Sequence, residues 1–354
     1  NPEAISFELA ALKAYNSVGK TMIFSEDKMD AFVLESEKKL KQAFPKSVWN
    51  ASMAYGEVVA SAILAWANED NYKETRSYPK FSVLPSPGRW QPTPPAYMDG
   101  IEPHWSKIRP FLLDSASQFV PAPPPPFSME PGSDFYNEVK KVYDAVKEAS
   151  EEEVAIASFW DCNPYVSNLS GHFMFATKKI TPGGHWMGIT TLASKQAGES
   201  FAEAAQTYAM VSLALADAFI SCWDEKYRSV LIRPETVINQ YLDDDWIPVL
   251  QTPPFPEHTS GHSVVSAAAA TVLEARFGKD FPFEDTVELE YGLPVRSYTG
   301  FRQAAKEAAI SRFFGGIHYL PAINEGVKQG DAVGNLLLSR LQFKNQLSVN
   351  QNPK

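Results

Sequence analysis

A long proline-rich stretch, from about residue 78 to residue 132, divides this sequence into parts of different character. It holds a large share of the 27 prolines of the chain, including the unbroken run Pro123–Pro126. Because proline lacks a backbone N–H and fixes φ, such a stretch runs extended rather than helical. Its aromatic residues, among them Trp90 and Trp105, indicate that it is pinned to the body of the protein. We therefore expect a long surface connection between two helical layers.

Helical spacing of apolar residues dominates the rest of the chain. Residues 3–70 repeat apolar side chains at helical intervals, as at Phe7, Leu9 and Leu12. The same criterion predicts later helices at about 133–154, 198–227, 260–277, 301–314 and 321–341. Strand signals are weak, and residues 163–184 resemble loops or short strands. The prediction is a mainly α helical bundle in one compact all-α domain, 1–354. Residues 1–132 would form its N-terminal helical and proline-rich part, and residues 133–345 its catalytic helical part.

The net charge and the cysteines limit the classes of function. With 32 Lys and Arg against 42 Asp and Glu, the net charge of −10 disfavours nucleic acid and anionic membrane surfaces as partners. No apolar run approaches the roughly 20 residues that span a bilayer; the longest, Tyr208–Ile220, is interrupted by Asp217. Cys162 and Cys222 permit one disulfide without arguing for it. Without a CxxC pair, a structural zinc site is not expected.

Three short blocks in the C-terminal half combine cations, a helix start and histidines: Lys226–Pro234, Thr259–Ser263 and Ser311–His318. Lys226, Arg233 and Arg312 supply three cations, about the number that a tetrahedral oxyanion with two or three negative charges needs. An acidic chain that binds an anion must concentrate its basic groups in this way. The blocks therefore predict an oxyanion site.

The remaining polar residues of these blocks suit the same site. Ser260 and Gly261 stand at a predicted helix start, where free backbone N–H groups and the helix dipole favour an anion and glycine permits close approach. His318 can offer a ring nitrogen to the central atom, and His262 can move a proton near neutral pH. The combination predicts one coordinating nitrogen and one acid–base group beside the oxyanion.

Two further histidines are given structural interpretations. A second Ser-Gly-His triplet, Ser170–His172, has no cationic block at matching spacing and is interpreted as part of a loop. His185 is interpreted as a structural residue at the start of a helix.

The three blocks, in this order, resemble the three-part signature of the superfamily that joins vanadium haloperoxidases with acid phosphatases. The resemblance covers about residues 198–326 and implies the helical bundle of that superfamily, a vanadate (V5+) cofactor, and His318 as the ligand of the metal. It also implies that His262 is the acid–base residue and that Lys226 is catalytic, polarising the O–O bond of peroxide. The implied ligands of the vanadate oxygens are Lys226, Arg233, Ser260, Gly261 and Arg312.

Other residues bear on the choice between peroxidase and phosphatase chemistry. Trp223 and Phe255 resemble the aromatic residues that line the halide pocket of haloperoxidases, although both could equally be core aromatics. The spacing of the motif residues most resembles that of a bacterial vanadium-dependent iodoperoxidase. Phosphatases of the superfamily usually carry Asp four residues after the last histidine, where this chain has Ala322. Without that carboxylate, His318 would be a less activated nucleophile, which favours the peroxidase.

The resemblance therefore implies an enzyme that oxidises a halide with hydrogen peroxide to hypohalous acid, with iodide expected and bromide as a second substrate. The alternatives are an acid phosphatase with a phosphohistidine at position 318 and, more weakly, an oxyanion-binding protein. We expect a monomer without nucleic-acid or membrane partners. We also expect it to be secreted or periplasmic, because the chain begins with Asn1 and resembles exported proteins whose signal peptide has been removed.

Overall fold

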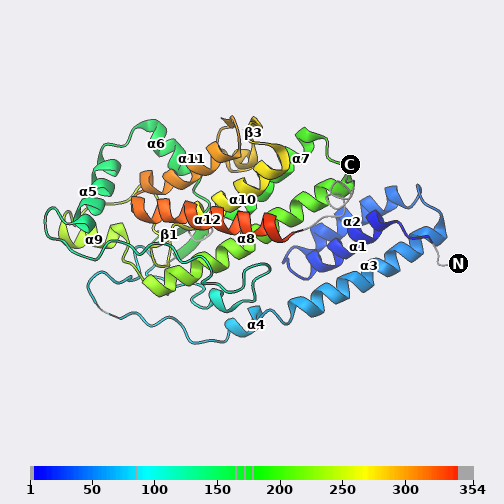
Figure 1. The fold of residues 1–354 in the computed structure, drawn as a ribbon, viewed down its shortest axis with the longest axis horizontal. Coiled ribbons are helices and arrows are strands. Elements are labelled where there is room, and N and C mark those ends of the chain that lie inside the picture. The colour runs from blue at the N-terminus through cyan, green and yellow to red at the C-terminus, as the bar shows by residue number, and fades with distance from the viewer. Residues whose placement is uncertain (1–3, 85, 164–165, 171–172, 178, 342–354) are drawn as a thin grey trace, which may run out of the picture. The chain divides into compact units, whose positions relative to one another are not determined.

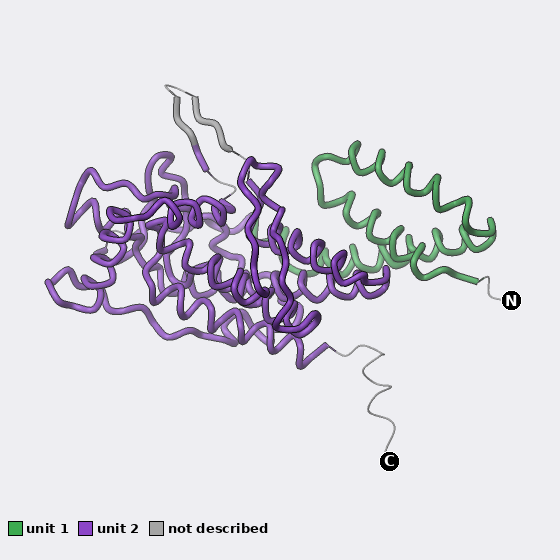
Figure 2. The backbone as a smooth tube through the Cα atoms, turned by 90° about the horizontal axis from the view of Figure 1, so that it is seen from above, with its two compact units in different colours: residues 1–76 green, residues 77–354 purple. Residues whose placement is uncertain are grey.

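The computed structural model describes residues 4–84, 86–163, 166–170, 173–177 and 179–341, which form two compact units, 1–76 and 77–354 (Figure 2). This division differs from the single domain with an internal boundary at residue 132 that the sequence suggests. The proline-rich stretch belongs to the second unit, because its backbone and side chains bond to helices of that unit.

In the described residues of the first unit, the regular elements are the helices α1 (Phe7–Lys20), α2 (Glu26–Leu40), α3 (Lys46–Ala67) and α4 (Tyr72–Thr75) (Figure 1). The hydroxyl of Ser6 caps α1 by accepting a hydrogen bond from the Leu9 amide. α1 packs against α3, and Gly56 permits the contact because a Cβ there would lie 2.7 Å from the Ala10 carbonyl oxygen. The helical prediction for this part of the chain is confirmed.

The second unit is a helical bundle with two small hairpins (Figure 1). β1 pairs antiparallel with β2, and β3 with β4. The mainly α prediction is confirmed, although the sequence pattern predicts neither α7 nor α9. The first residues of α7 fall in the stretch that resembles loops or short strands, and the eight residues of α9 are too few to show a helical period. The elements, in chain order, are η1 (Trp105–Lys107), α5 (Asp134–Lys147), α6 (Glu151–Phe159), β1 (Val166–Ser170), β2 (Phe173–Thr177), α7 (Pro182–Ala197), α8 (Phe201–Ser229), α9 (Pro234–Tyr241), α10 (Gly261–Phe277), β3 (Phe283–Asp285), η2 (Val287–Tyr291), β4 (Arg296–Tyr298), α11 (Phe301–Phe314) and α12 (Leu320–Arg340).

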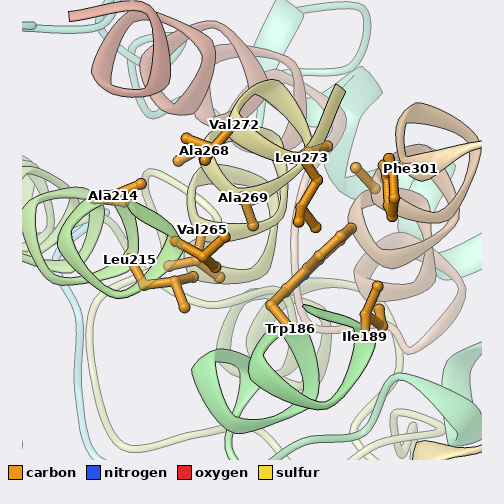
Figure 3. Packing of buried hydrophobic residues seen from close by; sticks show 14 of the residues in the cluster. Trp186, Ile189, Ala214, Leu215, Val265, Ala268, Ala269, Val272, Leu273 and Phe301 are labelled. Atoms are coloured by element: carbon orange, nitrogen blue, oxygen red, sulfur yellow. The ribbon is translucent and has the colours of Figure 1, made fainter. Parts of the chain in front are cut away.

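Helix α10 forms the centre of the second unit. Every residue from Ser263 to Leu273 is buried, and α7, α8, α11 and α12 pack around the helix. Four successive alanines, 267–270, keep it thin, so that its neighbours approach closely. Because α10 begins at Gly261, this packing also fixes the position of the Ser-Gly-His block. Figure 3 shows the core from close by, with side chains of α7, α8, α10 and α11 that include Trp186, Leu215, Val265, Ala269, Leu273 and Phe301.

Glycines on α12 let that helix lie directly against α10. A Cβ at Gly330 would lie 2.1 Å from the Val264 carbonyl oxygen, where no side chain fits. At the beginning of α12, the Ala322 carbonyl accepts a hydrogen bond of 3.0 Å from the Ser260 amide. The contact between the two helices therefore also holds the start of α10.

The proline-rich stretch is fastened to α8 by Asp217, the residue that interrupts the longest apolar run. Its buried carboxylate is compensated by hydrogen bonds from three successive backbone amides of the stretch, those of Phe111, Leu112 and Leu113, at 2.7, 2.7 and 3.0 Å. Further along α8, Trp105 stacks on Phe219 with ring centroids 5.2 Å apart. The prediction that this stretch is pinned to the body of the protein is confirmed.

Among the described residues, α8 is the helix that is long and apolar enough to cross a membrane. Over half of its most apolar window, 56%, is buried in the protein, because α7, α10 and α12 pack against it. A core helix meets the same criterion of length and composition.

We predict that Gly330→Ala lowers the free energy of unfolding by about 1–3 kcal/mol, because the added methyl group forces α12 away from α10. Urea denaturation measures the change. Gly183→Ala on α7 is the matched control, since a Cβ there meets its nearest neighbour, on Phe219, at an ordinary 3.6 Å. We expect that variant to stay within about 0.5 kcal/mol of the original protein. Equal stability of both variants would contradict the close contact at Gly330.

Candidate active site

Lys226 lies in the last turn of α8 with its ammonium group fully buried. Its Nζ donates to the backbone carbonyls of Pro256, Glu257 and Thr259 at 3.0, 3.1 and 2.6 Å. Because an ammonium group has three N–H donors, the loop before α10 engages all of them. Burial lowers the pKa of Lys226 to about 7, and the charge of Arg233 acts in the same direction. Donation from Lys226 to a bound anion therefore requires the exchange of one of these carbonyls.

Arg233 precedes α9 and is fully buried. α8 ends where Val230 adopts a left-handed conformation, φ 50°. The guanidinium donates from Nε to the Phe255 carbonyl at 2.9 Å and from Nη1 to the Ile317 carbonyl at 2.7 Å. Its buried Nη2 has no partner among the described residues. Burial lowers the pKa of Arg233 to about 10, so the group stays charged at neutral pH.

Arg312 is the third buried cation, in the last turn of α11. Its Nη2 donates to the carbonyl of Trp160, just after α6, at 2.7 Å, and its Nε to the hydroxyl of Ser311 at 3.1 Å. Burial lowers its pKa as well. The loop after α6 therefore sets the position of this guanidinium.

The start of α10 presents backbone donors. Ser260 is the N-cap, and its Oγ accepts a hydrogen bond from the Ser263 amide at 3.4 Å. The first amides of any helix lack acceptors within the helix, and its dipole makes this end positive. A Cβ at Gly261 would touch only Trp223 among the described residues, at 3.7 Å, so the backbone faces a space that an anion could fill.

His262 follows Gly261 and is half-buried. Burial and the charge of Arg312 hold its pKa well below the usual value, while a hydrogen bond with the Trp160 backbone acts in the opposite direction. The ring is therefore neutral at neutral pH. Its Nε2 is buried without a hydrogen-bond partner in the described part of the chain.

His318 lies between α11 and α12, where its ring is held from both sides. Its Nδ1 lies 2.7 Å from Oε1 of Glu257, and its Nε2 lies 3.2 Å from Nη1 of Arg233. Burial, then the charges of Arg233 and Lys226, hold its pKa well below the usual value. With the Nδ1 proton donated to Glu257, the lone pair of Nε2 accepts from Nη1 of Arg233, and a metal would take this lone pair in exchange for that hydrogen bond.

Glu257 is a site residue that the sequence analysis missed. It is fully buried and also accepts the Tyr319 amide at 2.9 Å. Burial raises its pKa to about 7, against the opposing charge of Arg233. The expectation that His318 lacks a carboxylate partner because of Ala322 is wrong, since Glu257 supplies one from another segment. Ala322 therefore does not favour a peroxidase over a phosphatase.

An aromatic wall borders the cations. The rings of Trp223 and Phe255 lie 5.0 Å apart, and the Nζ of Lys226 lies 5.8 and 5.0 Å from their centroids. Trp105, from the proline-rich stretch, packs edge-on against Trp223 at 4.9 Å. The sequence analysis recognised Trp105 as a pinning residue but did not connect it with the site. The predicted halide-pocket residues therefore lie together beside the predicted oxyanion site.

The charge balance of this cluster fits vanadate. Lys226, Arg233 and Arg312 are buried in a region where Glu257 is the carboxylate in contact with His318. The cations repel one another, as the influence of Arg233 on the pKa of Lys226 shows. An oxyanion would neutralise this charge and accept hydrogen bonds from donors such as Nη2 of Arg233.

The structure thus brings together the residues of the three blocks and the two aromatic residues that the sequence pointed to. The second Ser-Gly-His triplet is not part of this cluster: Ser170 ends β1, and Gly171 and His172 lie outside the described residues. His185 lies in the first turns of α7 and belongs to a different buried cluster.

Comparisons with known proteins identify the family of this chain. Residues 206–346 match the family described as the VCPO second helical-bundle domain. The chain is 55% identical to the protein in the crystal structure of the first bacterial vanadium-dependent iodoperoxidase, over 96% of this chain and 81% of that chain, with a TM-score of 0.90. Holo-type and apo-type crystal structures of a bacterial vanadium-dependent chloroperoxidase share the fold at 17% identity, with TM-scores of 0.69 and 0.72. Each match covers 94% of this chain, and it covers 81% of the holo-type chain and 82% of the apo-type chain. No curated protein matches the chain. The chain belongs to the vanadium-dependent haloperoxidase family.

Proposed function

We propose that this protein is a vanadate-dependent peroxidase that oxidises iodide with hydrogen peroxide to hypoiodous acid. The observation that carries the proposal is the burial of Lys226, Arg233 and Arg312 around a neutral His318. The 55% identical iodoperoxidase supports iodide as the halide. In the reaction, iodide gives two electrons to one peroxide oxygen, the O–O bond breaks, and one proton is consumed to yield hypoiodous acid and water.

When bound, vanadate supplies a V5+ centre that acts as a Lewis acid on peroxide, without an electron relay. His318 would hold the vanadium through Nε2, because Glu257 retains the Nδ1 proton. Arg233 would donate to an oxygen from its unpaired Nη2. The other groups that would hold the oxygens are Lys226, Ser260, Arg312 and the Gly261 amide.

His262 would accept a proton from peroxide and return it to the leaving oxygen. Its ring is neutral, because burial and Arg312 hold its pKa far below neutrality. The hydrogen bond to the Trp160 backbone orients the ring and leaves Nε2 as the basic nitrogen. The ring is free to accept a proton, and the negative charge of a bound oxyanion would raise the pKa of His262 from this low value towards the working pH, where a general base acts best.

Iodide would approach along the aromatic wall. Aromatic ring edges carry partial positive charge, so Trp223 and Phe255 can contact a large, polarisable anion in place of its water molecules. Lys226 lies within 6 Å of both ring centroids and would attract the halide towards the peroxide. We extend the proposal to bromide as a slower substrate and to a monomer that acts outside the cytoplasm.

A second candidate is an acid phosphatase that forms a phosphohistidine at His318. The observation that favours it is the hydrogen bond from His318 to Glu257, because a carboxylate partner makes the ring a better nucleophile.

A paired assay decides between these functions. In the first assay, protein loaded with orthovanadate and freed of excess is tested for triiodide formation from iodide and peroxide, with bromide in parallel. In the second, vanadate-free protein is tested for hydrolysis of a chromogenic phosphate monoester. We expect iodide oxidation that requires vanadate and is lost in His318→Ala. His104→Ala, outside the site, is the control and should keep the activity. Strong hydrolysis inhibited by vanadate, without halide oxidation, would establish the phosphatase instead.

We predict that Glu257→Gln weakens vanadate binding relative to sulfate binding by about 10–100-fold. Both oxyanions would gain from the removal of a nearby negative charge, but only vanadate forms a bond to the ring that Glu257 orients. Calorimetry with each anion gives the ratio. Glu235→Gln is the control, because this buried carboxylate also acts on Arg233 and has no bond to His318. An unchanged ratio in Glu257→Gln would remove the proposed role of Glu257.

We predict that sulfate binding weakens as the pH rises above about 7, by up to about tenfold per pH unit. Lys226, whose pKa is lowered to about 7, loses its proton in the free protein over this range and must regain it to hold the anion. Glu257 gains negative charge over the same range, which also weakens binding. Calorimetry in buffers of different ionisation enthalpy should show proton uptake, and Lys226→Met should give a shallower pH dependence. A flat wild-type profile would contradict the lowered pKa of Lys226.

A further inference from the structure

A second buried cluster of reactive side chains lies beside the active site and takes no part in the proposed reaction. Cys162 follows α6, His185 lies in α7, and Glu288 lies in η2. Cys162 is a free thiol that does not pair with Cys222. All three side chains are buried, and their ligand atoms lie within 4.8 Å of one another. The cluster therefore differs from a surface group of polar residues, which water would separate.

The distances within this cluster are close to those of a tetrahedral metal site. Nδ1 of His185 lies 3.0 Å from Oε1 of Glu288 and 3.5 Å from Sγ of Cys162, and the sulfur lies 3.9 Å from the same oxygen. Zinc bonds of about 2.3 Å to sulfur and about 2.0–2.2 Å to nitrogen and oxygen place tetrahedral ligands roughly 3.3–3.6 Å apart. One ion therefore fits between the three atoms with small adjustments of side chains.

Asp285 completes the arrangement that metal-binding histidines usually have. Its Oδ2 lies 2.7 Å from Nε2 of His185, and its Oδ1 accepts the Val287 amide at 3.0 Å. A carboxylate on the far nitrogen fixes the tautomer of the ring and directs the other nitrogen towards the metal. Trp160 stacks on the imidazole at 4.5 Å with an interplanar angle of 18°, so the orientation of the ring is fixed as well.

We propose that Cys162, His185 and Glu288 bind one zinc ion through Sγ, Nδ1 and Oε1, with a water molecule as the fourth ligand. Zinc fits this set of one sulfur, one nitrogen and one oxygen donor. On binding, the thiol proton of Cys162 and any proton on Nδ1 of His185 leave to solvent, so that a thiolate and a carboxylate balance the two charges of the ion. Asp285 keeps its hydrogen bond to Nε2.

This zinc ion would stabilise the segment that orients two groups of the active site. Trp160, two residues before Cys162, accepts the hydrogen bond from Arg312 at 2.7 Å and also bonds to His262 through its backbone. A metal ligand at position 162 would hold this carbonyl in place. The ion would thus be structural, and it would be distinct from the vanadate.

Metal analysis and cobalt spectroscopy test the proposal on untagged, vanadate-free protein. We expect close to one zinc per chain after incubation with zinc and removal of excess. Cobalt added to chelator-treated protein should produce a sulfur-to-cobalt charge-transfer band and the visible bands of tetrahedral cobalt, and zinc should displace both. Cys162→Ser should abolish the charge-transfer band. Cys222→Ser, which removes the other buried thiol, should retain it.

Wild-type protein that takes up neither zinc nor cobalt would overturn the proposal and leave the cluster as a hydrogen-bonded group with a proton on Nδ1 of His185. Loss of the band in Cys222→Ser would overturn the assignment of the thiolate. If Cys162→Ser does not fold, the titration of the wild-type protein still decides. None of these measurements depends on vanadate or on iodide oxidation, so the outcome is independent of the proposed function.

Discussion

The burial of three cations in one small region is the constraint on which the rest of the structure depends. Moving such charges out of water costs several kcal/mol each unless hydrogen bonds replace the lost hydration. Here the replacements are mostly backbone carbonyls of loops, those before α10 for Lys226, before α12 for Arg233 and after α6 for Arg312. Loop carbonyls are available because no helix uses them, so the paths of these loops and the positions of the cations determine each other.

The helices contribute mainly through their ends. Lys226 lies in the last turn of α8, where the helix dipole favours a cation, and Gly261 opens α10, where the dipole favours an anion. Arg312 lies in the last turn of α11, and His318 shortly precedes α12. The buried packing around α10 brings these four helix ends to one point. The packing of the core therefore sets the positions of the helix ends, and the residues of the site lie at or near those ends.

Sequence analysis succeeded where the information was local and missed what depends on distant segments. The helical class and the three motif blocks are visible because each is a short pattern, such as Ser260–His262 at a helix start. Glu257 was missed as the partner of His318, because nothing in a spacing of 61 residues indicates contact. The absence of CxxC pairs bears only on zinc ligands that are close in sequence, so it does not address the zinc site proposed above. Cys162, His185 and Glu288 come from three separate segments of the chain, which only the fold brings together.

Asp217 has a consequence for how halide preference could diverge in such proteins. One carboxylate on α8 fastens the proline-rich stretch, and that stretch carries Trp105, which backs Trp223 in the aromatic wall. The cations, by contrast, are held by other loops. The proline-rich stretch thus backs the aromatic wall through Trp105, whereas the groups that would hold the oxyanion are positioned by the loops and helix ends of the bundle. Substitutions in the proline-rich stretch can shift Trp105 and thereby reshape the aromatic wall, while Lys226, Arg233 and Arg312 keep their positions. Halide preference and vanadate retention can therefore evolve separately.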